Sequence, residues 1–188
     1  TLGAPLRLIC PLGGPSGQWY ASEMSTLGIA LRAIEADRET RRCHTIVEPD
    51  RVSEFNEPAP VLGREQLTAL AEAIQPADIS ILSGSVPSGM SDDDLLSLLH
   101  DLRAASGTVI VDTSGHALSL AVGIADYIAP NQREWRELEQ SWGLRDWPTQ
   151  TTALRTLAEG GLLVPDSPEV IWRAPTQKGN PTGAGDAL

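Results

Sequence analysis

The chain has 188 residues, of which 41% are hydrophobic and 21% are charged, as expected for a single globular domain with a substantial core. Its formal net charge of -11 argues against nucleic acid or an anionic membrane as a partner, and no apolar run is long enough to span a bilayer. Two cysteines without a signal-like start give no disulfide framework, so a cytoplasmic protein is expected.

Short β-type runs alternate with amphipathic helical stretches along most of the chain. The expected strands cover residues 6–14, 77–85, 107–115 and 126–130, and the expected helices cover residues 16–28, 91–106, 116–124 and 131–142. This order is typical of βαβ units, so the sequence predicts an α/β fold with a mostly parallel sheet and helices on both faces. The apolar run "TVIVD" fits a strand that is buried on both faces.

Residues 41–58 have a different pattern, because they alternate like two strands joined at Pro49 and Asp50. The sequence therefore predicts a hairpin off the main sheet. In an open α/β sheet, ligands bind in the crevice at the carboxyl ends of the strands. A hairpin inserted between two βαβ units is in a position to cover that crevice, so these residues are expected to form a lid.

Three turns rich in glycine or asparagine follow expected strands. They read "SGSVPSG" at residues 83–89, "DTSG" at 112–115 and "APNQRE" at 129–134. All three fall at carboxyl ends of strands, where small molecules bind. The chain closes on "GNPTGAGDAL", whose glycines allow close approach and whose free N–H groups would favour an anion if a helix begins there. A phosphate site beside Asp186 indicates phosphoryl transfer.

Taken in order, the motifs "TRR", "NEPAP", "SGSVPSG", "VDTSG", "PNQRE" and "NPTGAGD" resemble the ribokinase-like (PfkB) carbohydrate kinases. The resemblance covers nearly the whole chain and is strongest to the branch that phosphorylates hexose phosphates, such as 1-phosphofructokinase and tagatose-6-phosphate kinase. It implies a three-layer α/β sandwich with a small β lid, and an enzyme that uses ATP and Mg²⁺. Family members often pair through the lid, so a homodimer is expected.

The resemblance also implies roles at the end of the chain. Asp186 corresponds to the catalytic base that takes the proton of the attacking sugar hydroxyl. The backbone N–H groups of Gly183, Ala184 and Gly185 correspond to the anion hole for the transferring group. Phosphoryl transfer asks mainly for positioning and charge neutralisation, so amide donors, a divalent ion and one carboxylate are sufficient.

Four further residues receive roles from the resemblance. Asn131 and Glu134 correspond to the pair that organises Mg²⁺ and the nucleotide phosphates, mostly through water. Arg41 corresponds to the lid arginine that holds the phosphate already on the substrate, and Ser85 lines the same pocket. An arginine suits this task because its planar fork binds phosphate oxygens in a bidentate way.

Structural roles remain open for the same residues. Arg41 and Arg42 fit a solvated strand edge, Glu134 a helix cap, Ser85 a turn, and Asp186 a partner of the helix dipole. Two rival functions also remain open. A kinase of an unphosphorylated sugar or nucleoside would not need Arg41, and a non-catalytic sugar- or nucleotide-binding relative would not need Asp186.

The sequence departs from the family pattern in several places. The family's first strand and its glycine-rich sugar-binding turn are expected before Thr1, and the helix of the anion hole is expected to continue after Leu188. In residues 155–172 a predicted helix runs straight into "GLLV", so a central strand is missing and residues are expected to be omitted near 160–162. Ala129 stands where many relatives have a lysine.

Overall fold

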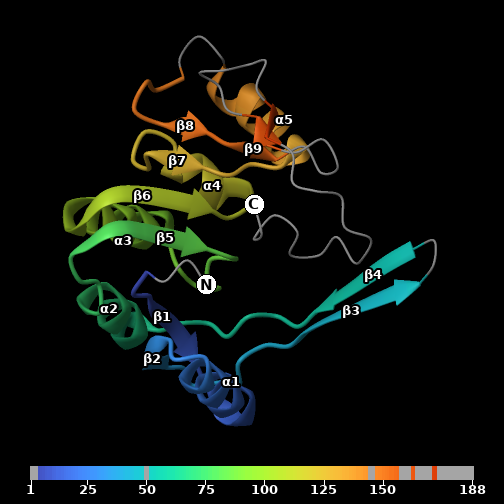
Figure 1. The fold of residues 1–188 in the computed structure, drawn as a ribbon, viewed down its shortest axis with the longest axis vertical. Coiled ribbons are helices and arrows are strands. Elements are labelled where there is room, and N and C mark those ends of the chain that lie inside the picture. The colour runs from blue at the N-terminus through green and yellow to red at the C-terminus, as the bar shows by residue number, and fades with distance from the viewer. Residues whose placement is uncertain (1–3, 49–50, 144–146, 157–161, 164–170, 173–188) are drawn as a thin grey trace. The chain divides into compact units, whose positions relative to one another are not determined.

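The computed structural model describes residues 4–48, 51–143, 147–156, 162–163 and 171–172 (Figure 1). The chain divides into two compact units. Unit 1 comprises Thr1–Gln75 with Pro87–Ser91, and unit 2 comprises Pro76–Val86 with Asp92–Leu188. The expectation of a single domain over residues 1–188 stays a prediction. Among the described helices, none combines the length and the apolar character that a membrane span requires.

Unit 1 is built on two parallel strands, β1 (Arg7–Leu12) and β2 (Ala30–Glu35), which pair along their whole length. α1 (Gly14–Thr26) connects the two strands, and α2 (Arg64–Glu72) packs against both of them. The sequence anticipated β1 and α1 but neither β2 nor α2. The core of this unit includes Leu12, Ile34 and Leu62, all less than a tenth exposed.

The predicted hairpin is confirmed: β3 (Cys43–Glu48) pairs antiparallel with β4 (Arg51–Asn56). Its apolar side chains lie on both faces of the ribbon. Ile46 and Phe55 share one face, and Val47 and Val52 share the other, because residues opposite each other in the register point the same way. All four are more than two fifths exposed. An isolated two-stranded ribbon is marginally stable, so both faces are suited to a covering partner.

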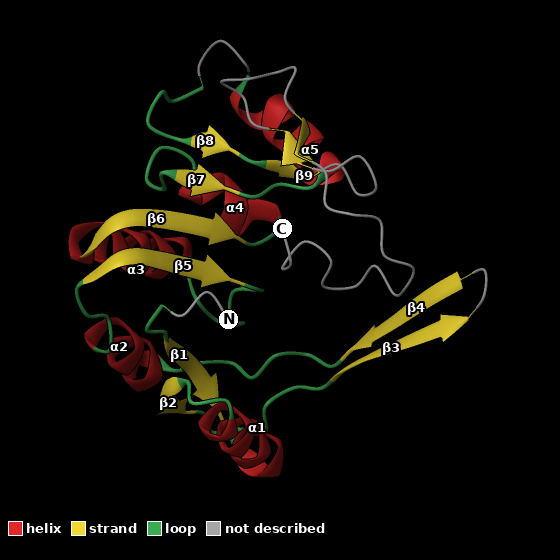
Figure 2. Cartoon of the chain, in the orientation of Figure 1, coloured by secondary structure: helices red, strands yellow, loops and turns green. Residues whose placement is uncertain are grey.

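Unit 2 contains a parallel sheet in the order β5-β6-β7-β8 (Figure 2). Its strands are β5 (Ala77–Ser83), β6 (Ser106–Asp112), β7 (Tyr127–Ile128) and β8 (Thr152–Ala153), and its helices are α3 (Asp92–Ala105), α4 (Gly115–Ala121) and α5 (Gln132–Trp142). These βαβ connections confirm the α/β class and the mostly parallel pairing. In β6 only one face is fully buried, since Val109 and Val111 are inaccessible whereas Ile110 is half-buried.

A helix is expected from Arg155 onward, but Arg155 and Thr156 form a strand, so the expectation is wrong for these two residues. Thr152 N–H donates to the carbonyl of Asp126 at 2.8 Å, and Thr156 N–H donates to that of Pro130 at 3.0 Å. Pairing with the segment that follows β7 therefore overrides local helix propensity at residues 155–156. β8 pairs with β7 in the parallel sheet. The expectation that residues are omitted near 160–162 stays a prediction, and residues 160–161 lie outside the described part.

β9 (Arg155–Thr156) continues from β8 and joins a small antiparallel sheet with β10 (Leu162–Leu163) and β11 (Ile171–Trp172). The order of this sheet is β11-β10-β9. Unit 2 thus contains one parallel sheet and one short antiparallel sheet that begins where β8 ends.

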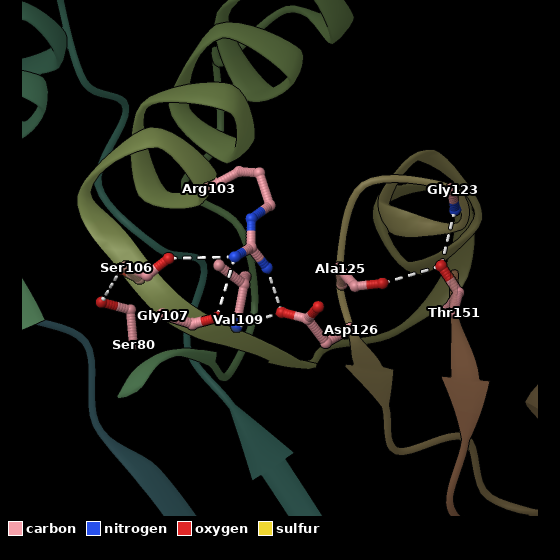
Figure 3. A network of polar contacts seen from close by, with 9 residues as sticks. All are labelled: Ser80, Arg103, Ser106, Gly107, Val109, Gly123, Ala125, Asp126 and Thr151. Atoms are coloured by element: carbon pink, nitrogen blue, oxygen red, sulfur yellow. Dashed lines mark hydrogen bonds and ion pairs between the residues drawn. The ribbon is translucent and has the colours of Figure 1, made fainter. Parts of the chain in front are cut away.

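A polar network ties together the end of the unit 2 sheet at which its strands begin (Figure 3). The Arg103 guanidinium, on the last turn of α3, pairs with the Asp126 carboxylate and donates to the carbonyl oxygens of Ser106 and Gly107 at 3.0 and 2.9 Å. Asp126 Oδ2 also accepts the N–H of Val109 at 2.7 Å. The network joins α3 and β6 to the start of β7.

Thr151 makes a comparable connection just before β8. Its hydroxyl accepts the N–H of Gly123 at 2.9 Å and donates to the carbonyl of Ala125 at 2.7 Å (Figure 3). The hydroxyls of Ser80 and Ser106 are 2.7 Å apart and link β5 to β6. Each strand of the sheet is therefore fastened to its neighbour at this amino end.

Candidate functional site

The three turns singled out in the sequence meet at the opposite, carboxyl end of the unit 2 sheet. The N–H of Gly84 donates to the carbonyl of Asp112 at 2.9 Å, and the N–H of Ala129 donates to that of Val111 at 3.1 Å. The turns after β5, β6 and β7 are therefore neighbours in strand order. This confirms that the parallel topology gathers them at one edge.

Ser85 lies in the first of these turns and is exposed. Gly84 before it has a φ of 88°, a left-handed conformation that favours glycine and turns the chain away from β5. The turn thus presents Ser85 next to the end of β6. Its role in binding a sugar phosphate stays a prediction.

Asn131 and Glu134 form a capping box at the start of α5. The side-chain oxygen of Asn131 accepts the N–H groups of Arg133 and Glu134 at 2.9 and 3.0 Å, and Glu134 Oε2 accepts the N–H of Asn131 at 2.9 Å. Glu134 is only 8% exposed. The helix-cap role that the sequence left open for Glu134 is therefore present, and it fixes both side chains at the sheet edge.

The same geometry tests whether these residues fit a magnesium ion. The Oδ1 atom of Asn131 already accepts two N–H groups, so its two lone pairs are used and direct coordination does not fit. Glu134 uses Oε2 for the cap, so a carboxylate oxygen remains for metal-bound water. Mg²⁺ commonly keeps several waters and takes one or two carboxylates. The residues fit an indirect role, and the described part of the chain holds no cluster of three or more potential metal ligands.

The sequence identifies the "DTSG" turn but assigns no role to Asp112 or Thr113 within it. Asp112 is the last residue of β6 and brings a carboxylate to this edge. Thr113 follows it, is 7% exposed, and its hydroxyl oxygen is buried with no hydrogen-bond partner among the described residues. The alternation of Val109, Val111 and Thr113 onto one buried face is the signal that would have found it. A buried hydroxyl without a protein partner is uncommon, which makes Thr113 a candidate for contact with water or a ligand.

At the base of the hairpin in unit 1, the adjacent residues Arg41 and Arg42 have different surroundings. Arg42 N–H donates to Glu57 Oε2 at 2.8 Å, and its guanidinium lies 3.7 Å from Glu39 and 3.8 Å from Glu57. Its side chain is 59% exposed, so the strand-edge role left open by the sequence describes Arg42. Arg41 is half-buried, which does not fit a fully solvated residue. Its role toward a substrate phosphate stays a prediction.

Glu39 lies beside this base and has a perturbed pKa. Its carboxylate accepts the Ser16 hydroxyl at 2.5 Å and the Ser16 N–H at 3.3 Å. The hydroxyl contact is the main cause that lowers the pKa of Glu39, with smaller help from the amide and Arg42 against the opposing effect of burial. Glu39 is therefore held in its charged form.

The residues expected to form the catalytic base and the anion hole, Asp186 with Gly183, Ala184 and Gly185, lie outside the described residues. Their roles stay predictions.

Comparisons with known proteins give a consistent result. Residues 1–188 match the model of the pfkB family carbohydrate kinase. ATP-dependent 6-phosphofructokinase isozyme 2 of Escherichia coli (strain K12) is 29% identical over 208 residues, which cover 100% of this chain and 67% of that protein. The 1-phosphofructokinase of Xanthomonas campestris pv. campestris is 30% identical over 213 residues, which cover 99% of this chain and 66% of that protein.

Among solved structures, phosphofructokinase-2 from Escherichia coli in complex with substrates and products superposes with a TM-score of 0.82 at 26% identity. The match covers 99% of this chain and 67% of that one. It confirms the ribokinase-like α/β fold expected from the sequence. The chain spans about two thirds of the length of these relatives.

Proposed function

Because the chain belongs to the pfkB family of carbohydrate kinases, we propose that it transfers the γ-phosphoryl group of ATP to a hydroxyl of a sugar that already carries a phosphate. The observation that carries the proposal is the edge of the unit 2 sheet, where the turns bearing Ser85, Asp112 and Asn131 lie side by side. Both curated relatives described above are phosphofructokinases, which supports a hexose phosphate as the substrate class.

In this proposal, the residues of the chain position and neutralise charge. The capping box holds Glu134 where it can orient metal-bound water, while Asn131 keeps the start of α5 in place for the nucleotide phosphates. Bound Mg²⁺ would offset the negative charge that the β- and γ-phosphates carry. Asp186 would take the hydroxyl proton, and the N–H groups of Gly183 to Gly185 would receive the phosphoryl oxygens.

A phosphorylated substrate is favoured over a free sugar because of Arg41. A half-buried arginine at the base of the hairpin suits a phosphate, which its guanidinium can bind through two parallel hydrogen bonds. A kinase of free sugars or nucleosides would have no use for this charge. We further propose that the chain works as one cytoplasmic kinase domain, and that the apolar faces of β3 and β4 support a homodimer.

An assay of ADP release with paired sugars and sugar phosphates tests the reaction and the substrate class together. Asp186→Asn keeps the size of the side chain but cannot accept a proton, so kcat should fall by about 10²- to 10⁴-fold. ATP affinity, measured by calorimetry, should stay within a few-fold.

Asp101→Asn, on the exposed face of α3, is the matched control and should leave turnover unchanged. Near-normal turnover in Asp186→Asn would show that the base lies elsewhere. ATP binding without turnover of any sugar in the unmodified protein would instead favour a non-catalytic relative.

A further inference from the structure

The short segment that carries Arg41 is fastened to the turn between β1 and α1. Thr40, the residue before Arg41, accepts the N–H of Gly13 on its hydroxyl at 2.9 Å and donates its own N–H to the carbonyl of Gly13 at 2.9 Å. Thr40 is half-buried. Both the side chain and the backbone of Thr40 are therefore fixed to the same residue.

The glycine-rich sequence of that turn, "GGPSG" at residues 13–17, is explained by this contact. A Cβ atom at Gly13 would overlap the carbonyl oxygens of Ala36 and Arg38, and one at Gly17 would lie 3.0 Å from the Thr40 hydroxyl. The turn needs glycine because the segment of residues 36–40 packs directly on its backbone. The glycines therefore allow residues 36–40 to pack closely against this turn.

A second set of contacts closes the base of the hairpin on the other side of Arg41. Arg42 and Glu57 exchange two bonds, from Arg42 N–H to the Glu57 carboxylate at 2.8 Å and from Glu57 N–H to the Arg42 carbonyl at 3.1 Å. Glu39 joins this base to α1 through the hydroxyl and N–H of Ser16. Arg41 thus stands between two anchored neighbours.

We propose that Thr40 is a positioning residue for Arg41, and that the two adjacent arginines have different tasks. Arg42 holds the hairpin base together with Glu39 and Glu57, whereas Arg41 holds the phosphate of the substrate. The inference rests on the function proposed above. Bidentate recognition requires the guanidinium to be held within about 0.5 Å of the productive geometry, so anchoring the backbone before it has a direct effect on binding.

The contacts differ in how much they contribute. The ion pairs of Arg42 are 3.7 and 3.8 Å long and exposed, a kind of pair that stabilises little. Thr40 instead satisfies both hydrogen-bonding groups of the Gly13 backbone, and removing its hydroxyl would leave the Gly13 N–H without this acceptor. Replacing Thr40 should therefore disturb the position of Arg41 more than replacing Glu39 or Glu57 would.

The test is a double-mutant cycle between Thr40 and Arg41 in the full chain. Thr40→Val removes the hydroxyl and keeps the shape, and it should raise KM for the sugar phosphate about 3- to 10-fold, the range set by one lost hydrogen bond, with kcat within about two-fold. Thr40→Ser keeps the hydroxyl and should restore KM. In an Arg41→Ala background, Thr40→Val should have no further effect on KM, because the group it positions is gone.

Hydrogen exchange provides a readout that does not depend on turnover. Thr40→Val should speed exchange of the Gly13 N–H, whereas Thr40→Ser should not. An equal effect of Thr40→Val on KM with and without Arg41, or an unchanged Gly13 exchange rate, would overturn the inference and leave the kinase assignment intact. Absence of turnover with every sugar phosphate in the unmodified protein would overturn the proposed function, and the phosphate task of Arg41 with it.

Discussion

The two ends of the unit 2 sheet are built from the same four strands but treat their polar groups differently. At the amino end, Asp126 pairs with Arg103 and accepts the Val109 N–H, and Thr151 both accepts and donates (Figure 3). At the carboxyl end, the Thr113 hydroxyl is buried without a hydrogen-bond partner in the part of the chain that the structure describes. Polar side chains thus gather at both ends, and the carboxyl end differs by holding one buried hydroxyl without a partner among the described residues.

The difference shows how to separate a structural cluster from a site. The amino-end network is explained by what it joins, since its bonds tie α3 and the starts of the strands together. A buried hydroxyl without a partner is unfavourable, so a group outside the described residues, such as water or a ligand, is expected to meet it. Together with the glycine turns at Gly84 and Gly115, this marks the carboxyl end as the functional one.

The largest effect on stability should come from the amino end. Asp126→Ala leaves the Arg103 guanidinium and the Val109 N–H without their shared acceptor, so the free energy of unfolding should fall by about 2–3 kcal/mol. Because the change lies at the opposite end from the turns, KM and kcat should be unchanged well below the melting temperature. Chemical denaturation and the ADP-release assay measure the two quantities.

Asp78→Ala is the matched control, since Asp78 is exposed at the start of β5 and its loss should change stability by less than about 0.5 kcal/mol. If Asp126→Ala abolished turnover while the protein remained folded, the separation of a structural end from a functional end would be wrong.

Much of this fold could be predicted from the sequence because its signals are local. The alternation of apolar runs with amphipathic stretches predicts β5, β6 and α3. The Pro49-Asp50 pair between two alternating runs predicts the hairpin. The strands at residues 152–156 could not be found in this way. They are short, and they are held by backbone bonds to β7, a partner distant in the sequence.

The candidate site could likewise be predicted from the sequence only where its signals are local. The turns could be predicted because glycine and asparagine follow strands, and the capping box could be predicted from the spacing of Asn131 and Glu134. The different surroundings of Arg41 and Arg42 could not, since both stand in one "TRR" motif and only the folded chain brings Glu57 to one of them. The burial of Thr113 could be predicted from its alternation with Val109 and Val111, but its lack of a hydrogen-bond partner among the described residues could not.

At the carboxyl end, Glu134→Gln should change the Mg²⁺ requirement of the reaction more than the stability of the fold. Glutamine can still accept the Asn131 N–H, so the cap and the melting temperature should be nearly preserved. Loss of the charge should raise the Mg²⁺ concentration needed for half-maximal activity about 10-fold, the lower range for residues that orient metal-bound water. A Mg²⁺ titration of ADP release measures this.

Glu137→Gln, one turn further along α5 and exposed, is the control. An equal loss of activity at limiting and saturating Mg²⁺ in Glu134→Gln would mean that Glu134 acts only as a helix cap.

Thr113→Val tests the orphan hydroxyl directly. Valine has nearly the same shape. Removing a buried polar group that has no partner among the described residues should leave the free energy of unfolding unchanged or raise it by up to about 1 kcal/mol. If the hydroxyl meets a bound ligand, affinity for ATP or for the sugar phosphate should fall a few-fold at the same time. Denaturation and calorimetry on one preparation give both values, and a clear destabilisation would show that Thr113 has a partner at rest.

The hairpin base holds a third polar cluster. It is exposed, so its contacts should stabilise the protein less than those at the two ends of the unit 2 sheet. The pKa of Glu39 lies below the ordinary glutamate value of about 4.3, chiefly because the Ser16 hydroxyl donates to its charged form. For a carboxylate whose pKa is lowered by folding, the contribution to stability is complete above the ordinary pKa and is lost as the pH falls through the folded value. Protection of the Ser16 N–H from hydrogen exchange, corrected for intrinsic rates, should therefore decline as the pH falls below the ordinary glutamate pKa and through the lowered pKa of Glu39.

Because Glu39 is exposed, the change should be small and should leave the melting temperature of the unit almost unchanged. Glu39→Gln separates this carboxylate from all others that titrate in the same range. In that variant, Ser16 protection should already be reduced at neutral pH and should not fall further because of residue 39. A parallel decline in both proteins would assign the acid sensitivity to other carboxylates. It would also show that the hairpin base is held by its backbone contacts, with Glu39 contributing nothing measurable.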